Sequence, residues 1–90
     1  MFIIEDDNHA ETQAGRFASF DEALAELQRR SCLPWNEPPN RAPCTSWRTC
    51  GRQYVIVECD TSVRPWEPIQ SHTVLEISAA GVKWLSCEPR

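Results

Sequence analysis

The sequence predicts a small two-layer α+β domain, in which one amphipathic helix packs on an antiparallel or mixed β-sheet of three to five strands. Three observations support this prediction. The chain has 90 residues, 41% of them hydrophobic, which is enough for a single domain spanning residues 1–90 and too little for two. One segment has the apolar period of a helix. The remaining apolar segments are rich in strand-forming residues, so the predicted order is β-α-β-β-β.

The N-terminal segment is expected to form a short strand at residues 2–4, followed by a polar loop or hairpin. Residues 2–4 are apolar, whereas residues 5–13 are polar and have no regular period. A second short strand at residues 13–17 would return beside the first, although Gly15 weakens its pattern.

The clearest predicted element is a helix that begins after Ser19. Ser19 and Glu22 form a capping box, in which the hydroxyl and the carboxylate each bind a free backbone amide of the first turn. Pro34 disfavours helical geometry at the residue before it, so the helix should end near Ser31 or Cys32. The predicted buried stripe consists of Phe20, Ala23, Leu24 and Leu27.

The second half of the chain predicts a long loop and three strands. The loop, residues 33–52, contains four prolines and two tryptophans and has neither a helical nor a strand period. Residues 53–60 are apolar on both faces and predict a central strand. Residues 61–70 are expected to form a connection. A hairpin follows, with a turn at residues 79–81 and a return strand at residues 82–87.

Composition restricts the partners and the compartment. Nine basic residues against thirteen acidic ones give a net charge of −4, which argues against nucleic acid as a partner. No apolar run approaches the roughly 20 residues of a membrane-spanning helix, and the N-terminus lacks the features of a signal peptide. We therefore expect a cytoplasmic protein with mostly reduced cysteines, among which Cys59 and Cys87 are expected to be buried.

The leading functional hypothesis is a non-enzymatic module that binds a partner protein or a small anionic ligand through residues 35–52. Residues 41–52 contain three arginines and no acid, and guanidinium groups bind carboxylates and phosphates in bidentate fashion. The alternative is that these arginines pair with the domain's own carboxylates and that Trp47 covers the sheet. A homodimer through an open sheet edge is also expected. The candidate binding residues are Trp35, Arg41, Trp47, Arg48 and Arg52.

The second hypothesis is a thiol-dependent redox or metal-linked activity centred on Cys44 and Cys50, through a reversible disulfide, a reactive thiol or a bound zinc ion. The alternative is that both thiols are inert. Five residues separate the two cysteines, which is wider than the usual spacing of a zinc knuckle. Further ligands would have to come from the other cysteines, from His9 or from His72, and no second close pair exists among them. His9 itself lies in an acidic segment that does not match an EF-hand and is expected to be solvated.

No catalytic motif accompanies either hypothesis. The sequence contains no nucleophile elbow, phosphate-binding loop, zinc-protease motif or dinucleotide fingerprint. We therefore predict no catalytic residues, no cofactor and no metal site. The absence of these motifs favours a non-enzymatic protein.

Overall fold

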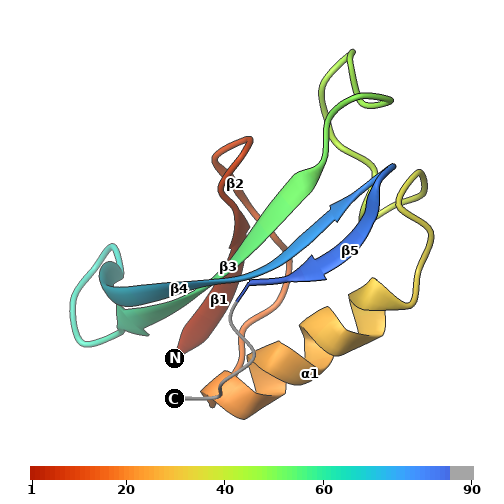
Figure 1. Cartoon of the computed structure of the whole chain (residues 1–90). Helices are drawn as coiled ribbons and strands as arrows, with labels where there is room; N and C mark the ends of the chain where they lie inside the picture. The colour runs from red at the N-terminus through yellow and green to blue at the C-terminus, as the bar shows by residue number, and fades with distance from the viewer. Residues whose placement is uncertain (86–90) are drawn as a thin grey trace.

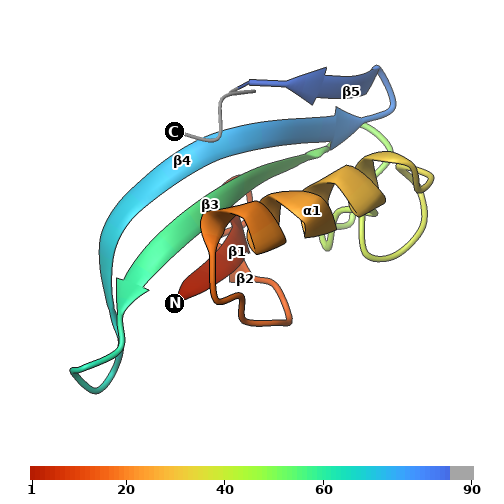
Figure 2. The ribbon, with the colours of Figure 1, turned by 90° about the horizontal axis from the view of Figure 1, so that it is seen from below.

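The computed structural model describes residues 1–85 as one helix packed on a five-stranded sheet (Figure 1). Neighbouring strands are all antiparallel and lie in the order β2-β1-β3-β4-β5. The helix lies along one face of this curved sheet (Figure 2). The predicted two-layer α+β domain is therefore confirmed, with an antiparallel sheet. The elements are β1 (Phe2–Asp6), β2 (Glu11–Thr12), α1 (Phe20–Ser31), β3 (Arg52–Asp60), β4 (Glu67–Ser78) and β5 (Gly81–Trp84).

The hydrophobic core lies between α1 and the sheet, because side chains alternate between the two faces of each strand. In β3, Tyr54 and Ile56 face the helix layer, whereas Val55, Val57 and Cys59 form a second buried cluster with Ile3 and Trp66. The strand is thus buried on both faces, as predicted for a central strand, and Cys59 is buried as expected. Cys87 lies outside the described residues. The main cluster contains Ile4, Phe20, Ala23, Leu27, Tyr54, Ile56, Val74, Leu75 and Ile77.

The capping box positions the helix as the sequence predicts. The Ser19 hydroxyl accepts a hydrogen bond of 3.1 Å from the Glu22 amide. A strict capping box requires the Glu22 carboxylate to accept from the amide of Ser19. In the structure it accepts from the amide of Ala18 instead. At the other end, the helix ends at Ser31, with Cys32 as its C-cap.

Several predicted boundaries differ from the structure, and β1 extends to Asp6 instead of ending at residue 4. The second strand is Glu11–Thr12 instead of residues 13–17, and Phe17 forms only an isolated bridge with Phe2. β4 begins at Glu67, so the predicted connection at residues 61–70 is too long. Pro68 is tolerated in β4 because β5 pairs only from Leu75 onward, which leaves this half of β4 as a sheet edge. The return strand is described only as Gly81–Trp84.

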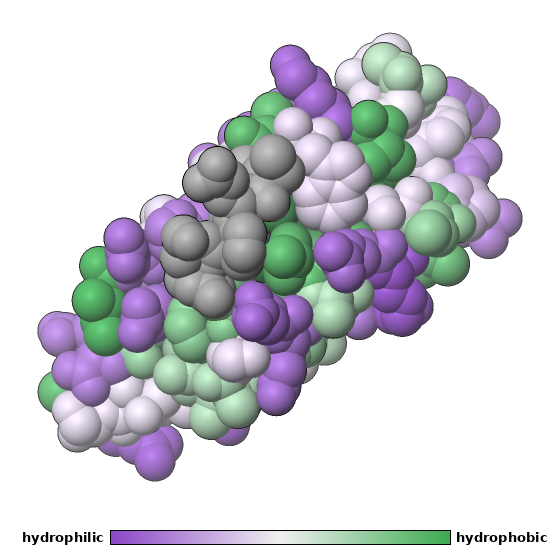
Figure 3. All heavy atoms as spheres, turned by 60° about the horizontal axis from the view of Figure 1, so that its bottom comes forward, coloured by the Kyte–Doolittle hydropathy of each residue, from purple (hydrophilic) through white to green (hydrophobic). Residues whose placement is uncertain are grey.

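The described part of the chain contains no helix with the length and hydrophobicity needed to cross a lipid bilayer. Figure 3 shows the face of the molecule near α1, where hydrophobic side chains are interspersed among hydrophilic ones. The exposed large hydrophobic side chains include Ile69 on β4 and Val82 and Trp84 on β5. These three side chains therefore lie on the edge strand β5 and on its neighbour β4.

Candidate functional site

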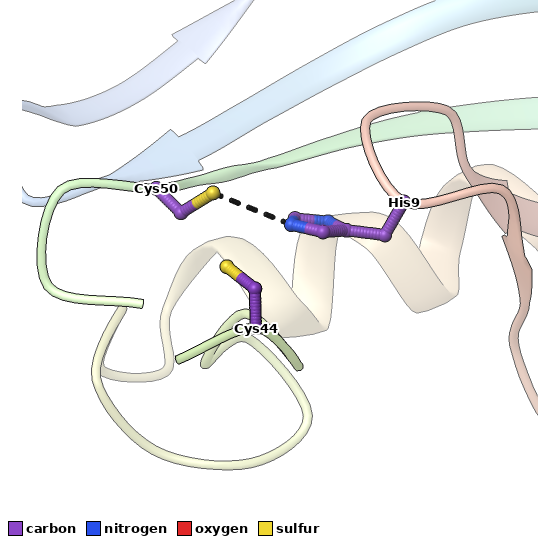
Figure 4. Close-up of side chains that lie close together, drawn as sticks. All are labelled: His9, Cys44 and Cys50. Atoms are coloured by element: carbon purple, nitrogen blue, oxygen red, sulfur yellow. Dashed lines mark hydrogen bonds between the residues drawn. The ribbon is translucent and has the colours of Figure 1, made fainter. Parts of the chain in front are cut away.

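Three potential metal ligands meet where the 32–51 loop, which connects α1 to β3, passes the turn between β1 and β2. His9 belongs to that turn, Cys44 to the loop, and Cys50 precedes β3 by two residues. Their ligand atoms all lie within 4.8 Å of one another, and His9 Nε2 is 3.3 Å from Cys50 Sγ. Figure 4 shows the three side chains pointing toward one another. We call these residues the three-donor cluster.

The orientation of His9 is fixed by Asp6, which is fully buried at the end of β1. Asp6 Oδ2 accepts a hydrogen bond of 2.6 Å from His9 Nδ1. The same oxygen also accepts a hydrogen bond from Arg52 Nη1, so Asp6 acts as the acceptor for both partners. The Nδ1 atom therefore carries the proton, and Nε2 faces the two sulfur atoms. The same contact with Asp6 raises the pKa of His9.

Arg52 holds Asp6 in place from the first position of β3. Its Nη1 atom donates to Asp6 Oδ2 over 2.9 Å and also to Glu11, and Nη2 donates to the Arg41 carbonyl. Its side chain is only 7% exposed. Among the candidate binding residues, Arg52 thus follows the alternative expectation, since it pairs with the domain's own carboxylates. Its ion pairs lie inside the fold, and its side chain also lines a pocket of the loop.

Cys50 is positioned by its neighbour Gly51, which packs directly against β4. A Cβ atom at position 51 would lie 2.7 Å from the Cβ of Ser78 and 2.8 Å from the Ile77 carbonyl oxygen. Only glycine permits this approach without a shift of the backbone. The Asn8 side chain donates to the Gly51 carbonyl over 3.1 Å, which ties the turn that bears His9 to the segment that bears Cys50.

The 32–51 loop is anchored to the core by Asn40, whose side chain is buried. Its amide nitrogen donates to the Arg30 carbonyl at the end of α1 over 2.9 Å, and its amide oxygen accepts from Tyr54 over 2.9 Å. The loop contains four prolines, which have no backbone N–H to donate. Side-chain hydrogen bonds therefore satisfy backbone carbonyls that a strand or helix would satisfy with backbone amides. The loop therefore has a defined path past the three-donor cluster.

Cys44 is the thiol best suited to ionise. Ser46 Oγ donates to Cys44 Sγ over 3.6 Å and, together with Cys50 and His9, lowers the pKa of Cys44 to about 7. The contact between Cys44 and Cys50 raises the pKa of Cys50, because the Cys50 proton is shared with the Cys44 sulfur. Near pH 7, Cys44 is thus close to the midpoint of its ionisation, Cys50 keeps its proton, and His9 faces the sulfur atoms through Nε2.

The other candidate binding residues surround Trp47. The guanidinium carbons of Arg41 and Arg48 lie 5.3 and 5.0 Å from the centre of the Trp47 ring. Trp35 lies 5.9 Å from the same ring and also packs against the main core. Among residues 1–85, neither Arg41 nor Arg48 forms an ion pair with a carboxylate. The structure therefore brings Trp35, Arg41, Trp47 and Arg48 together and places Arg52 beneath them.

Sequence reasoning named His9 only as one of several possible further ligands for the two cysteines, and it did not identify Asp6 and Asn40 as buried anchors. The expectation that His9 is solvated is wrong, because its side chain is only 13% exposed and contacts Asp6 and Cys50. His9 is 35 residues from Cys44 and 41 from Cys50, so no spacing rule joins them. The available signal is a histidine three residues after an aspartate at the end of an apolar strand.

No family model, curated protein or solved structure matches this chain. The function is therefore inferred from the residues and the geometry described above.

Proposed function

We propose that the three-donor cluster binds a thiophilic divalent cation, with Zn²⁺ as the best fit, and that this metal-linked site is the function of the domain. The observation that carries the proposal is the convergence of two segments, the β1–β2 turn with His9 and the 32–51 loop with Cys44 and Cys50. Their ligand atoms lie within 4.8 Å of one another. Zn–S and Zn–N bonds of about 2.3 and 2.0 Å give tetrahedral edges of roughly 3.5 to 3.8 Å. The distance of 3.3 Å between His9 Nε2 and Cys50 Sγ lies close to these values.

The surroundings of the cluster also fit a metal. Zinc-bound histidines usually donate their second ring nitrogen to a carboxylate or a carbonyl, and Asp6 accepts this hydrogen bond. Thiolate and imidazole ligands together favour Zn²⁺ over Mg²⁺ or Ca²⁺. Oxidation of Cys44 and Cys50 to a disulfide would need neither His9 nor Asp6. The participation of these two residues therefore favours metal binding over dithiol redox chemistry.

The number of ligands defines the kind of site. Structural zinc sites have four protein ligands, whereas three protein ligands leave a fourth position for water or another small molecule. The cluster found among residues 1–85 supplies three. Metal binding would also fix the 32–51 loop to the turn between β1 and β2. A reducing compartment, such as the cytoplasm expected from the sequence, would keep both thiols available as ligands.

The test is a titration of the reduced, metal-free full-length protein with Zn²⁺ against a competing chelator. We expect one Zn²⁺ per chain and a severe loss of affinity in C44S, C50S and H9Q. The matched control is C32S, which removes an exposed cysteine outside the cluster and should leave the affinity unchanged. Asp6→Asn should weaken binding about 10- to 100-fold, because it removes the partner that orients His9.

A spectroscopic measurement on the unmodified protein keeps the proposal testable even if the variants do not fold. Co²⁺ added to the unmodified protein should produce the intense charge-transfer absorption of a cobalt–thiolate bond. Absence of this absorption, together with no stoichiometric Zn²⁺ binding, would overturn the proposal. An equal loss of affinity in C32S and C44S would also contradict it, because the metal would then not be held at the three-donor cluster.

The leading sequence hypothesis, binding of a partner protein or a small anionic ligand through residues 35–52, remains a second proposal. The grouping of Arg41 and Arg48 around Trp47 without a carboxylate partner favours an anionic ligand. The variant that tests it is R41A/R48A, because Arg52 is needed inside the fold. Pairing of a second copy along the open edge of β4 is likewise a proposal, and R41A/R48A should not affect such a dimer.

A further inference from the structure

A pocket of about 390 Å³ adjoins the three-donor cluster. Cys44 belongs to both the cluster and the wall of this pocket. The wall also includes Arg41, Arg52 and Trp47, and three prolines of the loop supply apolar surface. The volume lies in the range of about 300 to 1,000 Å³ that is typical of small-molecule sites. The pocket and the three-donor cluster therefore share Cys44, whereas His9 and Cys50 do not line the pocket.

The pocket carries positive charge that the protein does not neutralise. Arg41 lines it and makes no ion pair with a carboxylate among residues 1–85, whereas Arg29, Arg30 and Arg52 all do. Arg52 also lines the pocket, and its buried Nε atom has no hydrogen-bond partner in the described part of the chain. Contact with the Trp47 ring holds the Arg41 guanidinium at the pocket.

The charge of a loaded metal site decides which ligand fits. A divalent cation with two thiolates and a neutral imidazole has no net charge, so the metal alone does not attract an anion strongly. Arg41 supplies the missing positive charge at the pocket. An oxyanion has one oxygen for the metal and others for a bidentate contact with a guanidinium group.

We propose that this pocket binds a small molecule carrying an oxyanion, either a carboxylate or a phosphate, at the fourth position of the metal and against Arg41. This inference rests on the metal site proposed above. One oxygen of the ligand coordinates the metal, and Arg41 donates to the others. The prolines and the Trp47 ring contact the rest of the molecule.

The test uses the full-length protein loaded with Co²⁺ and titrated separately with inorganic phosphate and with acetate. Replacement of the fourth ligand should shift the visible d–d bands of Co²⁺ in a saturable manner. Arg41→Gln should weaken this response about tenfold or more without changing the affinity for Co²⁺, because it removes a charge-assisted hydrogen bond. The matched control is Arg64→Gln, an exposed arginine in the connection between β3 and β4.

The outcomes separate the two proposals. If Co²⁺ does not bind at the cluster, the proposed function fails and this inference fails with it. If Co²⁺ binds but neither anion changes the spectrum, only the inference is overturned. Equal binding of phosphate by metal-free protein, measured by calorimetry, would also overturn it. A stronger response to phosphate than to acetate, or the reverse, supports the site and identifies its preferred oxyanion.

Discussion

The core beneath α1 and the end of the domain where the 32–51 loop meets the β1–β2 turn are held together by different forces. In the core, Leu27, Ile4 and Ile56 are fully buried among other apolar side chains. At the loop end, the fully buried side chains are polar, namely Asp6 and Asn40. Apolar burial contributes about 1.5 to 3 kcal/mol for each large side chain without requiring a particular partner. Buried polar groups depend on specific partners at hydrogen-bond distance.

This difference distinguishes the apolar core from the end of the domain that carries the candidate site. The core tolerates small changes in contact geometry, because hydrophobic burial has no directional requirement. The loop end places donors and acceptors at fixed distances, and the same contacts orient His9 toward the two cysteines. Mutations in the two regions should therefore differ in whether they change global stability or the order of the loop.

The largest expected effect is that of Leu27→Ala in the core. Leu27 is fully buried against the sheet, so its truncation removes apolar contacts and leaves a cavity. The free energy of unfolding should fall by about 2 to 5 kcal/mol, measured by urea denaturation. Gln28→Ala, at an exposed position of the same helix, is the control and should change stability little. An equal loss in both variants would show that the helix does not depend on its buried face.

An intermediate effect is expected for Asn40→Ala at the loop end. The change removes the hydrogen bonds of Asn40 with the Arg30 carbonyl and the Tyr54 hydroxyl, at a cost of about 1 to 3 kcal/mol. The Arg30 carbonyl keeps the Leu33 amide as a partner at 3.0 Å, and the Tyr54 hydroxyl keeps the longer contact of 3.4 Å with the Pro39 carbonyl. Hydrogen exchange should show faster exchange of the amides of residues 32–51, while β3 and β4 keep their protection. Asn36→Ala, an exposed asparagine of the same loop, should leave both patterns unchanged. Loss of protection throughout the sheet would contradict the separation of the two regions.

The smallest effect concerns an ion-pair network at the end of α1. Glu26 accepts hydrogen bonds from Arg29 and Arg30, and these contacts hold the pKa of Glu26 below its usual value of about 4.3. The network therefore stabilises the fold fully above this value, and the stabilisation is lost as the pH falls through the lower pKa of the folded protein. Glu26→Gln should remove about 1 kcal/mol at neutral pH, because the pair with Arg29 is exposed and the glutamine oxygen can still accept from the buried Arg30.

The pH profile tests the origin of that effect. Wild-type protein and E26Q should differ in stability near neutral pH and converge in acid, where Glu26 is protonated in both folded and unfolded chains. Glu37→Gln, which changes an exposed loop carboxylate, serves as the control and should follow the wild-type profile. A constant difference between E26Q and the wild type down to strong acid would show that the effect is not electrostatic.

Most of the fold was predictable because its signals are local. The capping residue Ser19, the stripe from Phe20 to Leu27 and the proline at position 34 define the helix within one short segment. The apolar run in β3 likewise predicts a strand buried on both faces. The start of β4 was not predictable, because Pro68 signals a break unless its edge position is known.

The candidate site was predictable only in part. The composition of residues 41–52 identifies the segment, and Cys44 and Cys50 are singled out by their chemistry. His9 could not be assigned to them, because its distance along the chain exceeds that of any local metal motif. Arg52 has the same side chain as Arg41, and only its position at the start of β3 brings it to Asp6.

The sequence alone therefore determined the two layers, the helix limits and the loop that carries the reactive side chains. Periodicity and capping act over a few residues, and they can be read without knowing which segments meet. Only the tertiary structure decided that His9 joins Cys44 and Cys50, that Asp6 orients it, and that Arg52 lies inside while Arg41 lines the pocket. These relations depend on the antiparallel pairing of β1 with β3, which pairs Asp6 with Tyr54 and brings His9 to Cys50, 41 positions further along the chain.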